Sequence, residues 1–502
     1  MATRFDMSQT RVDSSCRVPP PKILDCHRLR QDLEAKEDHT DPVPAFLNNL
    51  PAADLHIHGG ALCETGLATD IAWERSRERD GRLELLFGSK EALAEKLTAR
   101  APGSLKDYLF LYHALRDYLF TTLPDIKTVC HAGALNAFRT GTRLLEIRTS
   151  IKSGEVGDPA SRYLMKEAKF TPYEEFVAMI EGLEYASRAT GGRLRFHLIV
   201  TFRRGDSIEN SLKIFDEVVQ LRFKIREHFG KDYIRGLDIA GAEFGEANKG
   251  KRFKEIFRRA KEAGFFLTAH AGEEDGVGEG AILHALNHLN VDRIGHGSSL
   301  YLPTPLLDKS IIHTKNGVRK NAFIRLLQRG ISQEMCLTSN MIAGAQYTKG
   351  YMAVPGDKPK PDLKPIMSPA DYPFKMLMAL GDLVHKDTRE VLPLVCTDGT
   401  FSLHTNLARE YSIAAKNFDL GLGEVLALAY HSIQKSFAED TVKDDVIKTE
   451  WLPVASRYYD NPVQDVTTCL SRYRQRLRDE LELTPIDLTR IADEVCETTL
   501  YN

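Results

Sequence analysis

The sequence lacks the cysteine spacing that marks zinc ribbons and disulfide frameworks. It has no C-x-x-C pair, and its eight cysteines are scattered along the chain, at Cys16, Cys26, Cys63, Cys130, Cys336, Cys396, Cys469 and Cys496. Unpaired spacing of this kind is typical of reduced thiols in the cytosol. We therefore expect a cytoplasmic protein without structural disulfides.

Long apolar runs and a strong net charge are also missing. No run of about 18 apolar residues occurs, so we expect no membrane span. Residues 1–16 contain acidic side chains and no continuous apolar stretch, so no secretory signal is expected. The 67 basic and 70 acidic residues are well mixed and give a net charge of -3. This balance excludes a global field for a nucleic acid polymer or an anionic membrane, so any anion recognition must be local.

Short β-rich runs alternate with amphipathic helical stretches along most of the 502 residues. The strand candidates are Ala53–Ile57, Arg143–Arg148, Arg193–Phe202, Ile234–Ala240, Phe265–His270, Arg293–Gly295, Ser332–Leu337 and Leu392–Thr397. Eight such runs separated by helices predict parallel β/α units closed into a (β/α)8 TIM barrel.

The barrel is flanked by segments of different character. Residues 1–45 are polar and lack periodicity, which predicts an N-terminal arm. We place the barrel at residues 46–438 and a C-terminal helical extension at 439–502. The two terminal segments are candidates for covering the barrel or joining subunits of a homo-oligomer.

Three local patterns refine this outline. An apolar stripe from Leu105 to Leu119 at helical spacing predicts a helix that packs on the barrel. Six prolines in residues 355–373 exclude a regular helix there and favour a long ordered loop, as a lid or a contact surface. Asp419 is placed to cap a helix over residues 420–437.

Histidines at strand ends carry the chemistry. His56 and His58 stand two apart in a strand, so both side chains point to one face and can hold one ion. Taken alone, such a pair is equally well explained by histidines that bond to neighbouring backbone groups. His270 ends the fifth strand candidate and His296 the sixth, and Asp398 follows the last one.

These strand ends gather at one mouth of a parallel barrel. Three imidazoles and one carboxylate, from His56, His58, His270 and Asp398, suit one Zn²⁺ per chain with an open position for an activated water. Glu273 can stand beside the ion and shuttle a proton, while His296 can hold or deprotonate the water. Each residue has a structural alternative; for Glu273 it is an ordinary place near a helix N-terminus.

At this point the chain resembles the adenosine deaminase family of metal-dependent amidohydrolases. The resemblance rests on DLHIHGGAL (54–62), LLEIRTS (144–150), GLDIAGAE (236–243), TAHAGEEDG (268–276), RIGHGS (293–298) and CTDG (396–399). It implies a zinc-dependent hydrolytic deaminase of a small purine nucleoside or nucleotide. Glu273 would then protonate the purine ring, His296 would orient and deprotonate the water, and Gly241 would offer its backbone to the base.

The chain departs from the family pattern at two glycines. Gly60 replaces an acid that ordinarily meets the 5′ hydroxyl of the sugar, and Gly399 replaces an acid that ordinarily contacts the purine. Thr400, Ser402 and His404 are candidate substitutes for the second acid. Loss of a negative charge at Gly60 favours a 5′-phosphorylated substrate such as AMP or dAMP.

Two residues and two other functions complete the predictions. Arg203 and Arg204 are candidates to meet a substrate phosphate, with a solvated surface pair as the alternative. Other functions consistent with the sequence are a different amidohydrolase reaction, or a catalytically weak nucleotide-sensing or scaffold subunit. The presence of both Glu273 and His296 argues against the sensor, because binding alone requires neither residue.

Overall fold

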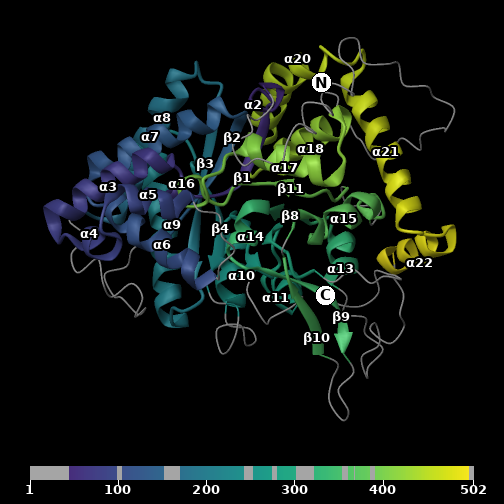
Figure 1. Ribbon diagram of the computed structural model, residues 1–502, viewed down its shortest axis with the longest axis horizontal. Coiled ribbons are helices and arrows are strands. Elements are labelled where there is room, and N and C mark those ends of the chain that lie inside the picture. Colours follow the sequence, from purple (N-terminus) through teal and green to yellow (C-terminus); the bar gives the residue numbers. More distant parts are fainter. Residues whose placement is uncertain are drawn as a thin grey trace.

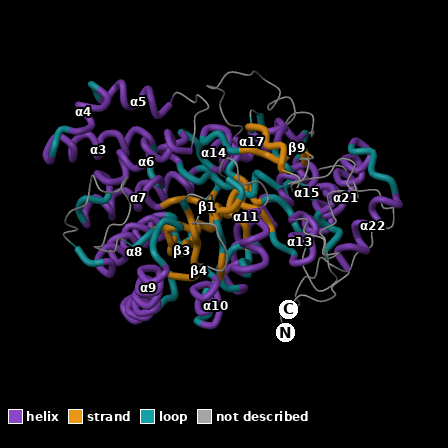
Figure 2. Tube along the Cα trace, turned by 90° about the horizontal axis from the view of Figure 1, so that it is seen from below, coloured by secondary structure: helices purple, strands orange, loops and turns teal. Residues whose placement is uncertain are grey.

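A computed structural model describes most of the chain (Figure 1). The described residues are 45–98, 105–151, 170–241, 243, 253–273, 280–300, 322–352, 360–366, 368–384 and 390–496. The arm predicted for residues 1–45 lies outside them, apart from its last position. Figure 2 shows the strands gathered at the centre of the molecule, with helices around them.

The central strands form the predicted barrel. They are β1 (Ala52–His58), β2 (Thr142–Thr149), β3 (Arg195–Arg203), β4 (Ile234–Ala240), β5 (Phe266–Leu267), β6 (His270–Ala271), β7 (Arg293–His296), β8 (Ser332–Met335) and β11 (Leu394–Val395). Two parallel sheets run in the orders β1-β2-β3-β4-β5 and β11-β8-β7-β6. β5 and β6 are two pieces of one strand, so they join the two sheets on one side.

The other side of the barrel closes where the last strand meets the first. Ile57 and Asp398 form a parallel bridge. The Asp398 amide donates to the His56 carbonyl at 2.7 Å, and the His58 amide donates to the Asp398 carbonyl at 2.9 Å. All eight predicted strands are therefore confirmed, and together they make a closed (β/α)8 barrel. Closure also fixes Asp398 beside the two histidines of β1.

Helices cover the barrel because their apolar faces pack on the outer faces of the strands. The first half contains α2 (Ala45–Asn48), η2 (Gly59–Ala61), α3 (Thr65–Arg79), α4 (Arg82–Phe87), α5 (Lys90–Thr98), α6 (Leu105–Leu119), α7 (Leu123–Arg139), α8 (Pro172–Ala189), α9 (Ile208–Phe229), α10 (Lys254–Glu262), α11 (Gly280–His284) and η5 (Ala285–Leu289). The predicted helix of the Leu105–Leu119 stripe is confirmed as α6.

Local sequence signals explain where the longer helices start. The Thr171 hydroxyl accepts a hydrogen bond from the Glu174 amide, and the Glu174 carboxylate accepts one from the Thr171 amide. α8 therefore begins with a complete capping box. The Ser207 hydroxyl caps α9, which ends at Gly230 in a left-handed conformation.

The remaining elements follow β7, the sixth strand of the barrel. They are α13 (Ala322–Arg329), α14 (Leu337–Ile342), β9 (Gln346–Met352), β10 (Lys360–Pro365), η6 (Pro369–Asp371), α15 (Phe374–Leu380), α16 (Thr400–Leu403), α17 (Leu407–Phe418), α18 (Leu422–Gln434), α19 (Asp440–Val446), η7 (Ile447–Trp451), α20 (Leu452–Ala455), α21 (Pro462–Glu480) and α22 (Pro485–Cys496).

Two local predictions are wrong. Asp419 does not cap α18, whose N-cap is Gly421; it ends α17 instead, in a left-handed conformation with φ 53° that aspartate tolerates better than most residues. The proline-rich stretch is not a continuous loop, because β10 pairs with β9 as an antiparallel ribbon. Prolines are compatible with an edge strand, and a two-stranded ribbon consists of edges only.

The C-terminal helices pack on the body of the molecule. α21 runs along the right-hand side of Figure 1, beside α15 and α18. Leu470, Tyr473 and Leu477 are buried, at 1%, 4% and 0% exposure. The Arg474 guanidinium donates to the Met378 carbonyl at 3.0 Å, which ties α21 to α15. Within the described part of the chain, the helices are too short or too polar to cross a bilayer.

Candidate active site

The predicted site residues converge at the carboxyl ends of the barrel strands. His58 ends β1, His270 begins β6, His296 ends β7, and Asp398 follows β11. In a parallel barrel these ends form one mouth, where side chains distant in sequence meet. His56, His270, His296 and Asp398 are buried, and His58 is partly exposed.

Four of these side chains form a compact ligand cluster. One donor atom from each of His56, His58, His270 and Asp398 lies within 4.8 Å of all the others. The Nε2 atoms of His58 and His270 are 3.1 Å apart. Asp398 Oδ1 lies 3.2 Å from His58 Nε2 and 3.5 Å from His56 Nε2. The fold therefore brings together the four residues predicted as metal ligands, although they span more than three hundred positions of the chain.

The tautomers of two histidines leave lone pairs directed at the centre of the cluster. His56 Nδ1 lies 3.0 Å from Glu334 Oε2, and His270 Nδ1 lies 3.1 Å from Asp238 Oδ1. A carboxylate only accepts hydrogen bonds, so each Nδ1 carries the proton and each Nε2 is unprotonated in the neutral ring.

A cation is the natural partner for these lone pairs. His56 Nε2 is buried and has no hydrogen-bond partner, which is costly unless another ligand satisfies it. Burial lowers the pKa of His270 well below its ordinary value, so that ring is neutral. A divalent cation at the centre of the cluster could bind these nitrogens and the Asp398 oxygen together, since they lie 3.1 to 3.5 Å from one another. The donor set fits a divalent metal.

Two of the site residues sit in an unusual backbone conformation. His296 has φ 61° and Asp398 has φ 63°, a region that non-glycine residues occupy only when the surroundings enforce it. The Ser339 hydroxyl donates to Asp398 Oδ2 at 2.6 Å and helps to hold that carboxylate. Although burial opposes it, contacts with His56 and His58 bring the pKa of Asp398 well below its ordinary value.

Glu273 and His296 form a second group beside the cluster. Glu273 Oε2 lies 3.5 Å from His296 Nε2, and both come within 4.8 Å of Asp398. Burial and the negative charge of Asp398 raise the pKa of Glu273 to about 8. Glu273 is therefore a carboxylic acid near neutral pH, able to donate a proton.

His296 has the opposite character. Burial lowers its pKa, and its Nδ1 lies 2.7 Å from Asn340 Oδ1. The amide oxygen accepts a hydrogen bond, so Nδ1 carries the proton and Nε2 is free to accept one. His296 Nε2 is buried without a hydrogen-bond partner. The two side chains thus form an acid and a base that face each other.

Several residues that position the site were not singled out from the sequence. Asp238 and Glu243 stand in the motif GLDIAGAE, but their roles depend on contacts with other strands. Asp238 orients His270, and the Glu243 carboxylate accepts the Gly272 and Glu273 amides at 2.7 and 3.2 Å. Glu334 orients His56 and Asn340 orients His296. For Asp238 the available signal was an ionisable residue between apolar neighbours in a strand.

A buried ionic network supports the floor of the site. The Glu334 carboxylate accepts hydrogen bonds from Arg148 and from Arg293, the latter at 2.6 Å. Arg293 also reaches Glu146 at 2.5 Å. These four side chains are almost fully buried. Against the effect of burial, the two guanidinium groups hold the pKa of Glu334 well below its usual range.

We expect Glu334→Gln to lower the free energy of unfolding by about 3–5 kcal/mol, because the buried guanidinium groups of Arg148 and Arg293 lose the carboxylate that they share. The substitution preserves shape, so the effect isolates the charge. Urea unfolding followed by fluorescence measures it, with the exposed Glu74→Gln as control. Equal unfolding midpoints for the two variants would show that the network contributes little.

Two predicted substrate contacts have structural partners. Arg204 is buried, and its terminal nitrogens donate to the Gly241 carbonyl, at 2.9 Å, and to the His270 carbonyl. Arg204 thus ties the end of β4 to the site. Gly241 has φ 97°, which favours glycine, and is exposed at the end of β4. Arg203 ends β3 beside them.

The residues after the last strand face the loop that follows β1. Gly399 is buried and precedes α16. The Thr400 hydroxyl lies 2.6 Å from the Leu62 carbonyl, and His404 Nδ1 lies 3.1 Å from the Thr65 hydroxyl. Ser402 is also buried. Gly60, in the loop itself, packs under Tyr112 and Arg116 of α6.

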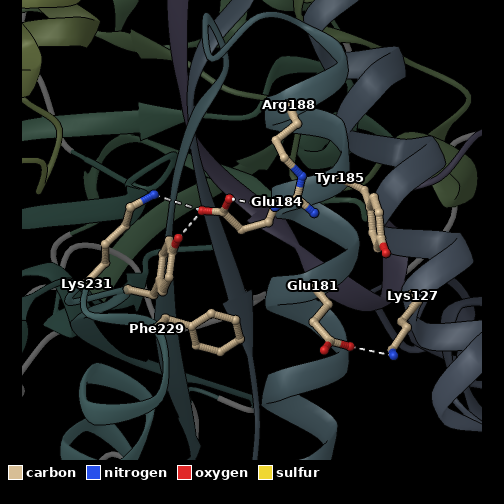
Figure 3. A pocket seen from close by; sticks show the side chains of 8 residues that line it. Lys127, Glu181, Glu184, Tyr185, Arg188, Phe229 and Lys231 are labelled. Carbon is tan, nitrogen blue, oxygen red and sulfur yellow. Dashed lines mark hydrogen bonds and ion pairs between the residues drawn. The ribbon is translucent and has the colours of Figure 1, made fainter.

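A pocket elsewhere on the molecule has a different character (Figure 3). It measures about 330 Å³, and Phe229, Lys231 and Tyr233, which precede β4, place it toward the opposite end of the barrel. Its charges are paired: Lys231 reaches Glu184 at 3.1 Å and Lys127 reaches Glu181 at 2.5 Å. No buried unpaired group in it calls for a ligand.

The closed parallel barrel, with a metal-binding cluster and an acid at its mouth, defines a metal-dependent hydrolase. The family model for adenosine deaminase matches residues 51–354, more than half of the chain. The chain therefore belongs to the adenosine deaminase family and is a hydrolytic deaminase.

Individual relatives are distant but cover most of the chain. An adenosine deaminase of Clostridium perfringens is 24% identical over 403 residues, which is 79% of this chain and 97% of the relative. The Arabidopsis N6-mAMP deaminase has a similar fold, with a TM-score of 0.58, 19% identity, and coverage of 80% and 98% of the two chains. A Burkholderia ambifaria amidohydrolase with bound Zn gives a TM-score of 0.56, 18% identity, and coverage of 93% and 99%.

Proposed function

We propose that this chain is a zinc-dependent deaminase that hydrolyses the 6-amino group of an adenine 5′-nucleotide, AMP or dAMP, to a 6-oxopurine and ammonia. One Zn²⁺ would be held by His56, His58, His270 and Asp398. The observation that carries the proposal is the convergence of three imidazole nitrogens and a carboxylate oxygen within 4.8 Å of one another, beside Glu273, whose pKa is raised to about 8. Nitrogen and oxygen ligands in this number suit zinc.

A bound divalent cation supplies Lewis acidity, which makes water a strong nucleophile near neutral pH. The chain supplies the proton transfers. His296, with a free Nε2, orients the water and takes a proton from it. Glu273, neutral at its raised pKa, donates a proton to the ring nitrogen next to the amino-bearing carbon as the aromatic bond order is lost.

Three further residues prepare these groups. Asp238 and Glu334 hold His270 and His56 in the tautomers that free their Nε2 atoms. Glu243 binds the amides of Gly272 and Glu273, which fixes the turn that presents the acid. The Gly241 backbone, directly after β4, would meet the purine.

A catalytically weak nucleotide sensor is the alternative from another class. Nucleotide binding alone does not require a protonated carboxylic acid, Glu273, 3.5 Å from an imidazole, His296, whose Nε2 can accept a proton. A different amidohydrolase reaction is the second alternative. It rests on Gly399, which stands where the family has an acidic residue that contacts the purine ring. A substrate panel separates these possibilities.

We expect ammonia release from AMP or dAMP with a larger kcat/KM than from adenosine, deoxyadenosine or ATP. The measurement is a coupled ammonia assay on the purified chain, with metal content determined on the same sample. Zinc near one equivalent with turnover of the nucleotides supports the proposal. A much larger kcat/KM for adenosine than for AMP and dAMP would contradict the choice of nucleotide, and tight binding without ammonia would favour the sensor.

A further inference from the structure

Arg116 is a buried cation close to the metal-binding cluster. It lies on α6 and is only 8% exposed. Its stem passes directly over Gly60, two residues after His58: a Cβ atom built on Gly60 would lie 2.7 Å from Arg116 Cγ and 2.9 Å from Cδ. Side chains do not approach so closely, so any larger residue at position 60 would displace the arginine.

The charge of this arginine is not neutralised by the described residues. Its guanidinium forms no ion pair with a carboxylate in the described ranges; its contact there is with the ring of Tyr112, whose centroid lies 6.0 Å from the guanidinium carbon. Asp117 and Glu175 act on it only through space. A buried cation without a bonded anion is costly. Arg148 and Arg293 on the barrel floor differ from Arg116 in this respect, because each forms an ion pair with a buried carboxylate.

Tyr112 connects this cation to the site. Its ring lies 6.2 Å from the His58 ring and stacks on Phe401, at 6.4 Å and an interplanar angle of 12°. Its hydroxyl would lie 2.9 Å from a Cβ on Gly60. Burial raises the pKa of Tyr112, and Arg116, Asp398 and Arg203 all act on it electrostatically. The positive charges of Arg116 and Arg203 therefore both act on this hydroxyl at the edge of the mouth.

We propose that Arg116, seated over Gly60, binds the phosphate of the substrate and is a specificity-determining residue that makes the enzyme prefer 5′-nucleotides to nucleosides. The inference rests on the proposed deaminase function and deepens it. A guanidinium presents parallel donors that match phosphate oxygens, and burial strengthens the pairing. A dianion would also offset the positive charge of Arg203, which acts on the same tyrosine.

The neighbouring arginines are less suited to this role. The terminal nitrogens of Arg204 already donate to the carbonyls of Gly241 and His270. Arg203 ends β3 and is less buried than Arg116. Arg188 offers a matched control, because it also lies over a tyrosine of its own helix, 4.7 Å from the Tyr185 ring centroid, at the remote pocket of Figure 3.

The test compares Arg116→Met, Arg116→Lys and the control Arg188→Met with the wild-type protein. We expect Arg116→Met to lower the ratio of kcat/KM for AMP to kcat/KM for adenosine by about 10- to 150-fold, the loss that charged hydrogen bonds produce. The effect should fall mainly on the KM for AMP. Arg116→Lys keeps the charge without the planar fork, so its loss should be smaller. Arg188→Met should leave the ratio unchanged.

Binding of ribose 5-phosphate by calorimetry separates this inference from the proposed function. If the wild-type protein deaminates neither AMP nor adenosine, the function is wrong, but Arg116→Met should still weaken ribose 5-phosphate binding and Arg188→Met should not. Should Arg116→Met fail to fold, Arg116→Lys carries the comparison in both assays. Unchanged specificity and unchanged ribose 5-phosphate binding in a folded Arg116 variant would overturn the inference.

Discussion

Glu273→Gln is expected to lower kcat for deamination by about 10²- to 10⁴-fold, the contribution typical of a positioned general acid. The raised pKa of about 8 keeps the native carboxyl protonated near neutral pH, and glutamine has no proton of comparable acidity to give. Glutamine has nearly the same shape as glutamate, so the substitution should not disturb the site. Glu273 is also not one of the four residues of the metal-binding cluster, which lies beside it. The metal content should therefore stay at the wild-type level.

The two measurements are steady-state kinetics and elemental analysis on the same preparation. Glu262→Gln, on the exposed face of α10, serves as the control and should match the wild type in both. A Glu273→Gln variant with metal bound and with substantial activity would remove the proton-donor role. Loss of metal in this variant would instead place Glu273 among the ligands.

The fold was predictable because each strand carries its own signal. The run Leu392–Thr397 is largely apolar, and the run Ala53–Ile57 alternates apolar residues with Asp54 and His56. The residues of both runs are buried in the barrel. The positions of His56, His58, His270 and Asp398 at strand ends were enough to place them at one mouth. Parallel strands also suit an open sheet, so closure is established by the bridge between Ile57 and Asp398.

The orienting partners were not predictable in the same way. Glu334 contacts His56 across 278 positions of the chain, and Asn340 contacts His296 across 44. No spacing rule links such residues, because the contact depends on which strands are neighbours and on which face each side chain points. Gly60 shows the same limit: the sequence reveals a missing acid, whereas only the structure reveals the arginine that lies over the gap.

The two local errors also have a physical origin. Aspartate is favoured both at a helix N-cap and in the left-handed conformation that ends a helix. Asp419 lies between two helices, and the structure assigns it to the earlier one. In the proline-rich stretch, the pairing of β10 with β9 depends on a partner strand that the local sequence does not specify.

The second large effect concerns the metal. We expect His270→Ala to abolish stoichiometric zinc binding, because it removes one of the four proposed ligand side chains and leaves Asp238 without its imidazole. Activity should be lost with the metal. Affinity should fall by more than the roughly 10- to 100-fold that loss of an orienting partner produces.

Asp238→Asn provides the graded comparison that makes this prediction specific. It keeps the His270 ring but removes the carboxylate that fixes its tautomer, so we expect zinc affinity to fall by about 10- to 100-fold and added zinc to restore turnover. Added zinc should not rescue His270→Ala. Competition with a chromogenic chelator gives the affinities, and the exposed His288→Ala is the control. If His270→Ala retained one zinc per chain with wild-type affinity, His270 would not be a ligand, and the cluster would have to be assigned around the remaining donors.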